Sequence, residues 1–105
     1  MQFQATVFVA ISKINISQDM SDELEKSFRE RSRKVDSVDG FLGLQFLRSK
    51  KNTNKFRGIF RFRDEESFKK YMKSDLHRKS HDKTHQAINE AIKSNSVEFF
   101  HEITQ

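Results

Sequence analysis

Three histidines spaced four residues apart are the side chains of this chain best suited to chemistry: His77, His81 and His85. Side chains at this spacing lie on one face of a helix, so the three imidazoles would form one stripe. Ile88 and Ile92 continue roughly the same stripe. A stripe that changes from histidine to isoleucine is expected to point inward or into a pocket, and we expect any chemistry there.

A row of imidazoles first suggests a zinc or copper site, because a histidine pair at this spacing binds metals well. A third ligand would have to come from elsewhere in the fold, since the chain has no HExxH motif and no cysteine. The plainer interpretation is that these histidines belong to the core or to the rim of a pocket. The spacing by itself therefore does not favour a dedicated metal site.

Two elements upstream must position the histidines. Residues 55–63 alternate between aromatic or small side chains and mostly basic ones, which predicts a strand. The acidic residues that follow favour the start of a short helix, which buries Phe68 and Tyr71. That helix is expected to break near Ser74, and a second helix carrying the histidines is expected to run to about residue 93.

The remaining elements complete one small domain. Alternation predicts strands over residues 2–12, 41–48 and 97–103, and a three-to-four periodicity predicts a helix over residues 19–36. The order is therefore βαββαβ, with the second helix split in two. That order is typical of the ferredoxin-like α+β fold, a four-stranded antiparallel sheet with helices on one face. Residues 1–105 are expected to form a single domain of this kind.

A sheet covered by helices on one face leaves its other face open. Apolar side chains there would be exposed in a monomer, and two sheets packed face to face in a homodimer would cover them. We therefore expect a homodimer. The candidates for this open face are Phe8, Ala10, Leu42, Leu44, Phe46 and Phe100.

Basic residues outnumber acidic ones by 20 to 15, and part of the excess is local. A basic segment of this kind can meet nucleic acid, an anionic ligand or only water. The solvated hairpin is the favoured interpretation. The basic residues concerned are Arg48, Lys50, Lys51, Lys55, Arg57, Arg61 and Arg63.

Composition also bears on location. The absence of cysteine excludes a disulfide framework, an iron–sulfur cluster and a thiolate zinc site. No apolar run approaches the roughly 20 residues that span a membrane, and the N-terminus lacks a basic-then-apolar signal layout. We therefore expect a cytoplasmic protein without a membrane partner.

The sequence also resembles a known family. The motif Asp-Gly-Phe-Leu-Gly at residues 39–43 is followed by a strand, by Arg-Asp-Glu-Glu-Ser-Phe at residues 63–68, by Tyr-Met-Lys-Ser-Asp at residues 71–75 and by His81. This pattern resembles the heme-degrading monooxygenases of the antibiotic biosynthesis monooxygenase superfamily, which are dimeric α+β barrels. The resemblance covers nearly the whole chain, and residues 62–81 are its most specific part.

The resemblance implies roles for individual residues. In that family a histidine ten residues after a tryptophan is the axial ligand of heme iron, and an asparagine lies on the first strand. His81 is at the histidine position, Tyr71 at the tryptophan position and Val7 at the asparagine position. Valine cannot donate the hydrogen bond that asparagine provides. Phe62 is at a second tryptophan position of the family, at the end of a strand. Phe68 and, at the rim of the pocket, His77 are further residues expected at the heme.

The function implied is heme binding followed by oxidative opening of the porphyrin and release of iron. Heme would be both cofactor and substrate, with O2 and an external electron donor, either a protein or a small reductant. Val7 also leaves open a non-catalytic heme-binding protein. A third alternative is a cofactor-independent monooxygenase acting on a quinol-like substrate, with a histidine as base. A nucleic-acid-binding module is the most remote alternative, because no basic-Gly-aromatic-Gly motif is present.

Overall fold

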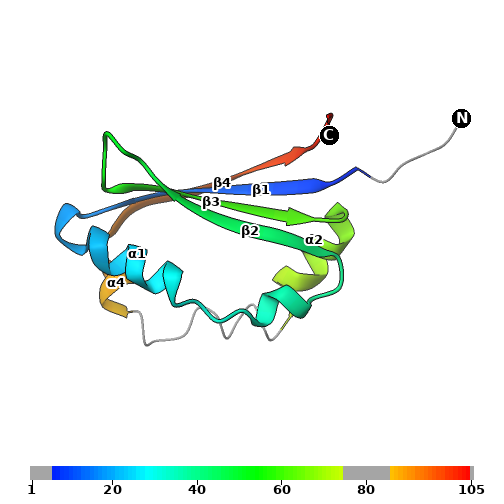
Figure 1. The fold of residues 1–105 in the computed structure, drawn as a ribbon, viewed down its shortest axis with the longest axis horizontal. Helices are drawn as coiled ribbons and strands as arrows, with labels where there is room; N and C mark the ends of the chain where they lie inside the picture. Colours follow the sequence, from blue (N-terminus) through cyan, green and yellow to red (C-terminus); the bar gives the residue numbers. More distant parts are fainter. Residues whose placement is uncertain (1–5, 75–85, 105) are drawn as a thin grey trace, which may run out of the picture.

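The fold is built on one four-stranded antiparallel sheet, and the computed structural model describes residues 6–74 and 86–104 of the chain. The sheet order is β2-β3-β1-β4, so the first and third strands are central. Figure 1 shows the sheet as one layer, with the helices forming a second layer on one side of it. The strands are β1 (Phe8–Ile16), β2 (Phe41–Arg48), β3 (Lys55–Phe62) and β4 (Ile92–His101).

Among the described residues, three short α-helices and two 3-10 turns make up the second layer. The order of strands and helices along the chain, and their segregation into two layers, confirm the ferredoxin-like α+β fold. Within the described residues, no helix has the length and apolar character needed to cross a bilayer. The elements are η1 (Gln18–Met20), α1 (Ser21–Arg29), η2 (Lys34–Ser37), α2 (Glu65–Met72) and α4 (Gln86–Ala91).

The first strand extends further than its alternation predicted. It was expected to end at residue 12, whereas β1 continues to Ile16. Ile14 and Ile16 are 9% and 0% exposed, and the strand pairs with β3 on one side and β4 on the other. Burial of these two β-branched side chains outweighs the polar residues between them, so the strand persists.

The predicted helix over residues 19–36 is wrong in its second half. Helix α1 ends at Arg29, and the chain then forms the short turn η2, which buries Val35. The apolar periodicity fails at Arg31, so a continued helix would have turned a charged side chain towards the core.

The last strand also begins earlier than predicted. Ile92 was expected in a helix, but it pairs with Ile16 as the first residue of β4. The backbone N–H of Ser17 donates to the Ala91 carbonyl (2.9 Å), which joins the end of α4 to the end of β1. Residues 86–91 of the predicted histidine helix form α4, and its residues 75–85 lie outside the described residues.

The predicted assignment of side chains to the two faces of the sheet is wrong for most of the residues named. The Phe8 ring lies 5.1 Å from the Phe68 ring of α2, and the Phe46 ring lies 3.8 Å from the Phe28 ring of α1. Even-numbered residues of β1 therefore face the helices, and Ala10 on the same side is 2% exposed. The prediction of an open-face position was wrong for Phe8, Ala10, Leu44 and Phe46, and correct for Phe100.

The reason lies in the first strand itself. Both of its alternating sides are apolar near the start, so residues 6–12 do not distinguish them. The difference appears only further on, where Ile14 and Ile16 are apolar and Lys13 and Asn15 are polar.

The open face combines a few apolar side chains with ion pairs. Lys13 pairs with Glu98, and Arg61 pairs with Glu102. Between them the strand register places apolar side chains on three neighbouring strands. These are Val9 and Ile11 of β1, Ile59 of β3 and Phe100 of β4.

The helix side holds two separate core clusters. The first joins one end of the sheet to α1, and the second joins the other end to α2 and η2. The buried members of the first cluster are Ile14, Ile16, Leu24 and Phe56. Those of the second are Val35, Phe62 and Tyr71.

A tight turn fixes the position of α2 against β2. Gly40 has a φ of 84°, and a Cβ at this position would lie 2.4 Å from the Ser67 Oγ of α2. The position therefore needs glycine for both its conformation and its space. The Gly40 carbonyl also accepts a hydrogen bond from the Arg63 backbone N–H (2.6 Å). The Asp-Gly motif thus has a structural role in this chain.

Asp64 caps the N-terminus of α2. Its Oδ1 accepts a hydrogen bond from the Ser67 backbone N–H (2.8 Å). That bond is the main reason why the pKa of Asp64 is lowered. A carboxyl whose pKa is lower in the folded state stabilises the fold above its unfolded-state pKa of about 3.9. The contribution is lost as the pH falls through the lower folded-state pKa.

We therefore expect Asp64→Ala to lower the melting temperature at neutral pH, because the first turn of α2 loses its cap. Asp64→Asn keeps an acceptor oxygen and should cost less. Thermal unfolding followed by circular dichroism measures both variants at about pH 7 and about pH 2.5. The gap between wild type and Asp64→Ala should narrow at the lower pH, and an unchanged gap would contradict the capping role.

Candidate ligand site on the helix side of the sheet

Five aromatic rings meet on the helix side of the sheet, at the end where α2 packs. We call Phe8, Phe62, Phe68, Tyr71 and Phe99 the aromatic cluster. Phe68 of α2 is at its centre, with its ring 5.1 Å from Phe8, 5.5 Å from Phe62 and 5.7 Å from Phe99. Phe62 in turn stacks on Tyr71 at 5.7 Å. Three strands and one helix therefore contribute to one group of rings.

The aromatic cluster is buried at one end and exposed at the other. Phe62 and Tyr71 are 0% and 8% exposed, and they belong to the second core cluster. Phe99 on the edge strand β4 is 58% exposed, and Val97 on the same side of that strand is 47% exposed. A large exposed aromatic surface is typical of a binding site for a partner or ligand. We therefore take the end formed by Phe8, Phe68 and Phe99 as the candidate site.

Three of the predicted site residues come together in this cluster, namely Phe62, Phe68 and Tyr71. The extent of burial distinguishes the roles of these three residues. Tyr71 and Phe62 form the core behind the site, while Phe68 packs against the exposed ring of Phe99. In this arrangement Tyr71 and Phe62 support the surface ring from behind.

The other predicted residues are not brought to the cluster by the described structure. Val7 directly precedes β1, and its carbonyl accepts a hydrogen bond from the Glu102 backbone N–H (3.0 Å). Because Phe8 faces the helices, strand alternation puts the Val7 side chain on the open side. The predicted axial ligand His81 and its neighbour His77 lie outside the described residues.

Phe8 and Phe99 were missed by the sequence-based prediction. Both are apolar residues at positions where the alternation of their strands could be assigned to either face. The available signal was the pattern further along β1, where Ile14 and Ile16 show which side of the strand is buried.

Two polar side chains on the same side of the sheet were also missed. Ser12 lies in the middle of β1, paired with Gly58 of β3 and Val97 of β4. Its hydroxyl can both donate and accept a hydrogen bond. His101 is paired with Phe8 and follows Phe99 by two residues, so it shares their side of the sheet. The site therefore has one hydroxyl and one imidazole beside its rings.

Charged groups border the site at the start of α2. Arg63 contacts Asp39 and Asp64, with its Nη2 3.3 Å from Asp39 and its Nε 3.4 Å from Asp64. The hydrogen bond to Asp39 is the main reason why the pKa of Arg63 is raised. Among the described residues, no three histidine, aspartate or glutamate side chains are placed to hold a metal ion. The described part of the site is thus aromatic, with polar groups at its margins.

A ferredoxin-like sheet with a group of aromatic rings on its helix side, exposed at one end, defines a small α+β protein. The family can be stated more closely. The model of the antibiotic biosynthesis monooxygenase family matches residues 7–83, and the chain belongs to this family.

Solved structures share the whole fold at low sequence identity. A protein from Shewanella oneidensis is 15% identical, with 96% of this chain and 95% of that one covered and a TM-score of 0.75. The heme-degrader MhuD from Mycobacterium tuberculosis, solved with two hemes in its active site, is 24% identical over 93% of this chain and 97% of its own, with a TM-score of 0.74. A conserved protein from Methanosarcina mazei is 11% identical, with coverages of 90% and 91% and a TM-score of 0.73. No curated protein matches the chain. At these identities the likeness shows the fold.

Proposed function

We propose that this protein binds heme at the aromatic cluster and opens the porphyrin oxidatively, with release of iron. The exposed end of the aromatic cluster carries the proposal, because it offers flat apolar surface in a chain of the monooxygenase family. The motif pattern of residues 62–81 supports the same substrate. MhuD, which has the same fold, is a heme-degrader.

The described residues fit a flat, mostly apolar ligand. Phe99 and Phe68 provide ring faces, and Val97 extends this surface along β4. The Ser12 hydroxyl supplies a hydrogen-bond donor that Val7 cannot. His81 is the proposed axial ligand of the heme iron, as the resemblance implies.

In this proposal the heme is the substrate, and its iron supplies the oxygen chemistry together with O2 and an external electron donor. The protein does three things. Its rings orient the porphyrin, its apolar side chains limit water, and its imidazole holds the iron.

The open face of the sheet supports a proposed homodimer. Val9, Ile11, Ile59 and Phe100 form an apolar strip there, bordered by the Lys13–Glu98 ion pair. Two such faces packed together would bury Ile11, Ile59 and Phe100, whereas Val9 is already buried within the chain. A face that packs on its own copy forms a two-fold interface.

One observation favours a second candidate, a cofactor-independent monooxygenase acting on a quinol-like substrate. His101 lies on the same side of the sheet as Phe8 and Phe99. An imidazole beside an aromatic surface can remove the proton of a bound phenol, which is the first step of that chemistry. A non-catalytic heme-binding protein remains the alternative if heme binds and is not turned over.

A hemin titration followed by ascorbate in air tests the proposal. A saturable Soret band that bleaches with iron release supports heme degradation, and a stable band supports heme binding alone. Absence of a band would contradict both, and oxidation of a quinol by the heme-free protein would then favour the second candidate.

Phe99→Ala locates the heme on the sheet. Loss of one stacked ring should weaken hemin binding by about tenfold, close to 1.4 kcal/mol. Phe100→Ala is the matched control, because it removes the adjacent ring of β4 from the open face. It should leave hemin affinity unchanged and weaken the proposed dimer. Equal losses of hemin affinity in the two variants would place the ligand elsewhere.

A further inference from the structure

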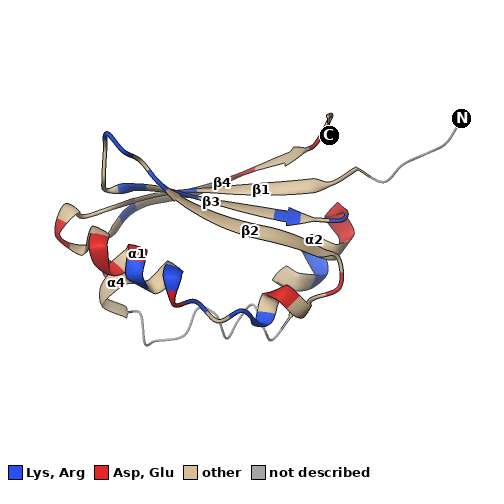
Figure 2. Ribbon diagram, in the orientation of Figure 1, with Lys and Arg blue, Asp and Glu red and all other residues tan. Residues whose placement is uncertain are grey.

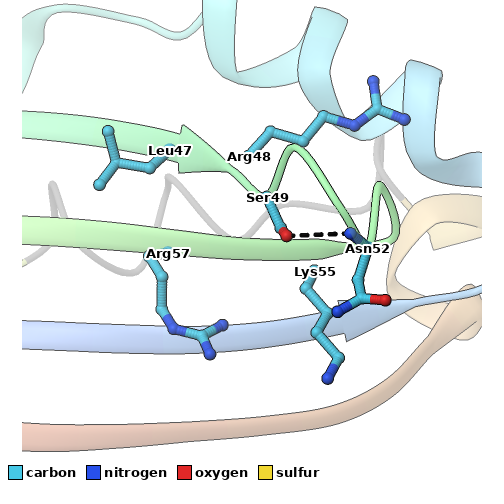
Figure 3. A pocket seen from close by; sticks show the side chains of 6 residues that line it. All are labelled: Leu47, Arg48, Ser49, Asn52, Lys55 and Arg57. Carbon is cyan, nitrogen blue, oxygen red and sulfur yellow. Dashed lines mark hydrogen bonds between the residues drawn. The ribbon is translucent and has the colours of Figure 1, made fainter.

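A hollow lies at the loop between β2 and β3, at the border of the open face and away from the aromatic cluster. It measures about 360 Å³ and is lined by Leu47, Arg48, Ser49, Asn52, Lys55 and Arg57. Figure 3 shows Lys55 and Arg57 extending to the same side of the hairpin, while Arg48 extends the other way, towards α1. We call this hollow the hairpin pocket.

The loop that forms the hairpin pocket is held by its own hydrogen bonds. The Asn52 backbone N–H donates to Ser49 Oγ (3.0 Å), and the Lys55 backbone N–H donates to the Asn52 carbonyl (2.9 Å). The end of β1 anchors the same loop, because the Ile16 backbone N–H donates to the Asn54 carbonyl (3.0 Å). A loop held at both ends presents its side chains in a fixed arrangement, which lowers the entropic cost of binding.

The charge of the hairpin pocket is unbalanced. Residues 40–63 contain no acidic residue. Arg48 is neutralised, because its Nη1 lies 2.9 Å from both Asp22 and Glu25 of α1. Its hydrogen bond to Glu25 is also the main cause of the lowered pKa of that carboxyl. Within the described part of the chain, Lys55 and Arg57 have no carboxylate partner. Figure 2 shows blue basic residues and no red acidic residues along the hairpin of β2 and β3.

Arg57 is positioned to bind an oxyanion. Among the described residues its Nη1 donates to the Phe56 carbonyl (2.9 Å), which fixes the guanidinium and leaves its other N–H groups for a ligand. A planar guanidinium holds phosphate or carboxylate oxygens in a two-pronged geometry, and a lysine ammonium adds a point charge beside it. Leu47 is paired with Arg57 and gives the pocket an apolar side.

We propose that the hairpin pocket binds the phosphate group of a small phosphate monoester, with Arg57 and Lys55 on the phosphate and Leu47 against the organic part. The volume suits a single small molecule. A nucleic-acid strand is less well matched, because binding of a single strand uses a basic groove with aromatic rings along it. The side chains of this pocket lie at the opposite end of β3 from Phe62. The proposal therefore does not depend on the heme function.

Phenyl phosphate is the probe that tests this proposal, by isothermal titration at low ionic strength. Binding should be saturable, and Arg57→Gln should weaken it at least tenfold, with a smaller loss in Lys55→Gln. Lys34→Gln on η2 is the matched control, because it removes one exposed positive charge far along the chain from the hairpin. Melting temperatures of all three variants verify that they are folded.

Equal binding by Arg57→Gln and Lys34→Gln would overturn the proposal. So would absence of phenyl phosphate binding together with salt-sensitive binding of a single-stranded oligonucleotide, which would assign the basic hairpin to nucleic acid. The hemin affinity of the same variants should match that of the wild type, which would show that the hairpin pocket and the heme site are independent.

Discussion

Phe62→Ala is expected to lower the free energy of unfolding by about 3–5 kcal/mol. Phe62 is completely buried, and its ring packs against Phe41, Phe68 and Tyr71 at 5.5–5.7 Å. Alanine would leave a cavity among three rings that are held by β2 and α2, so collapse into it would be incomplete.

Chemical denaturation followed by circular dichroism measures this loss. Phe62→Leu should cost clearly less, because it keeps most of the buried apolar volume. Phe100→Ala is the comparison for an exposed ring, since Phe100 is 46% exposed on the open face. If Phe62→Ala and Phe100→Ala lost the same stability, the second core cluster would not hold this end of the sheet.

The effect of Phe62→Ala should extend to the candidate site. Phe62 supports Phe68, and Phe68 packs against the exposed ring of Phe99. We therefore expect hemin affinity to fall in Phe62→Ala even at temperatures where the variant is fully folded. A binding surface loses affinity when the core residues that hold its side chains in place are removed.

His81→Ala is expected to abolish axial ligation of hemin, because alanine leaves no ligand for the iron at that position. The Soret maximum should shift to that of a weakly held or free heme, and turnover with ascorbate should stop. Added imidazole should restore the ligated spectrum in part, since it can bind at the vacated position. These expectations rest on the proposed heme function.

The other two histidines of the sequence stripe provide the matched controls. His77→Ala and His85→Ala remove the same side chain at spacings of four residues on either side. Both should keep the ligated spectrum, because the family motif points to His81 alone. An unchanged spectrum in His81→Ala, with loss in either control, would reassign the ligand to a neighbouring turn of the chain.

The sequence by itself was sufficient for the fold class and the family. Alternation and three-to-four periodicity revealed each strand and each described helix, because these patterns follow from backbone geometry alone. The motifs at residues 39–43 and 62–81 pointed to the monooxygenase family, which the match over residues 7–83 confirms. The grouping of Phe62, Phe68 and Tyr71 was also predictable, since they flank one strand-to-helix junction.

Only the tertiary structure decided which side of the sheet faces the helices. When both sides of a strand are apolar, the local sequence pattern does not show which side is buried. In β1 the pairing with β3 and β4 and the burial of Ile14 and Ile16 decide which side faces the helices. That choice moved Phe8 into the aromatic cluster and Val7 out of it. It also brought Phe99 of the last strand beside Phe8 of the first, a contact set by long-range strand register that no local periodicity encodes.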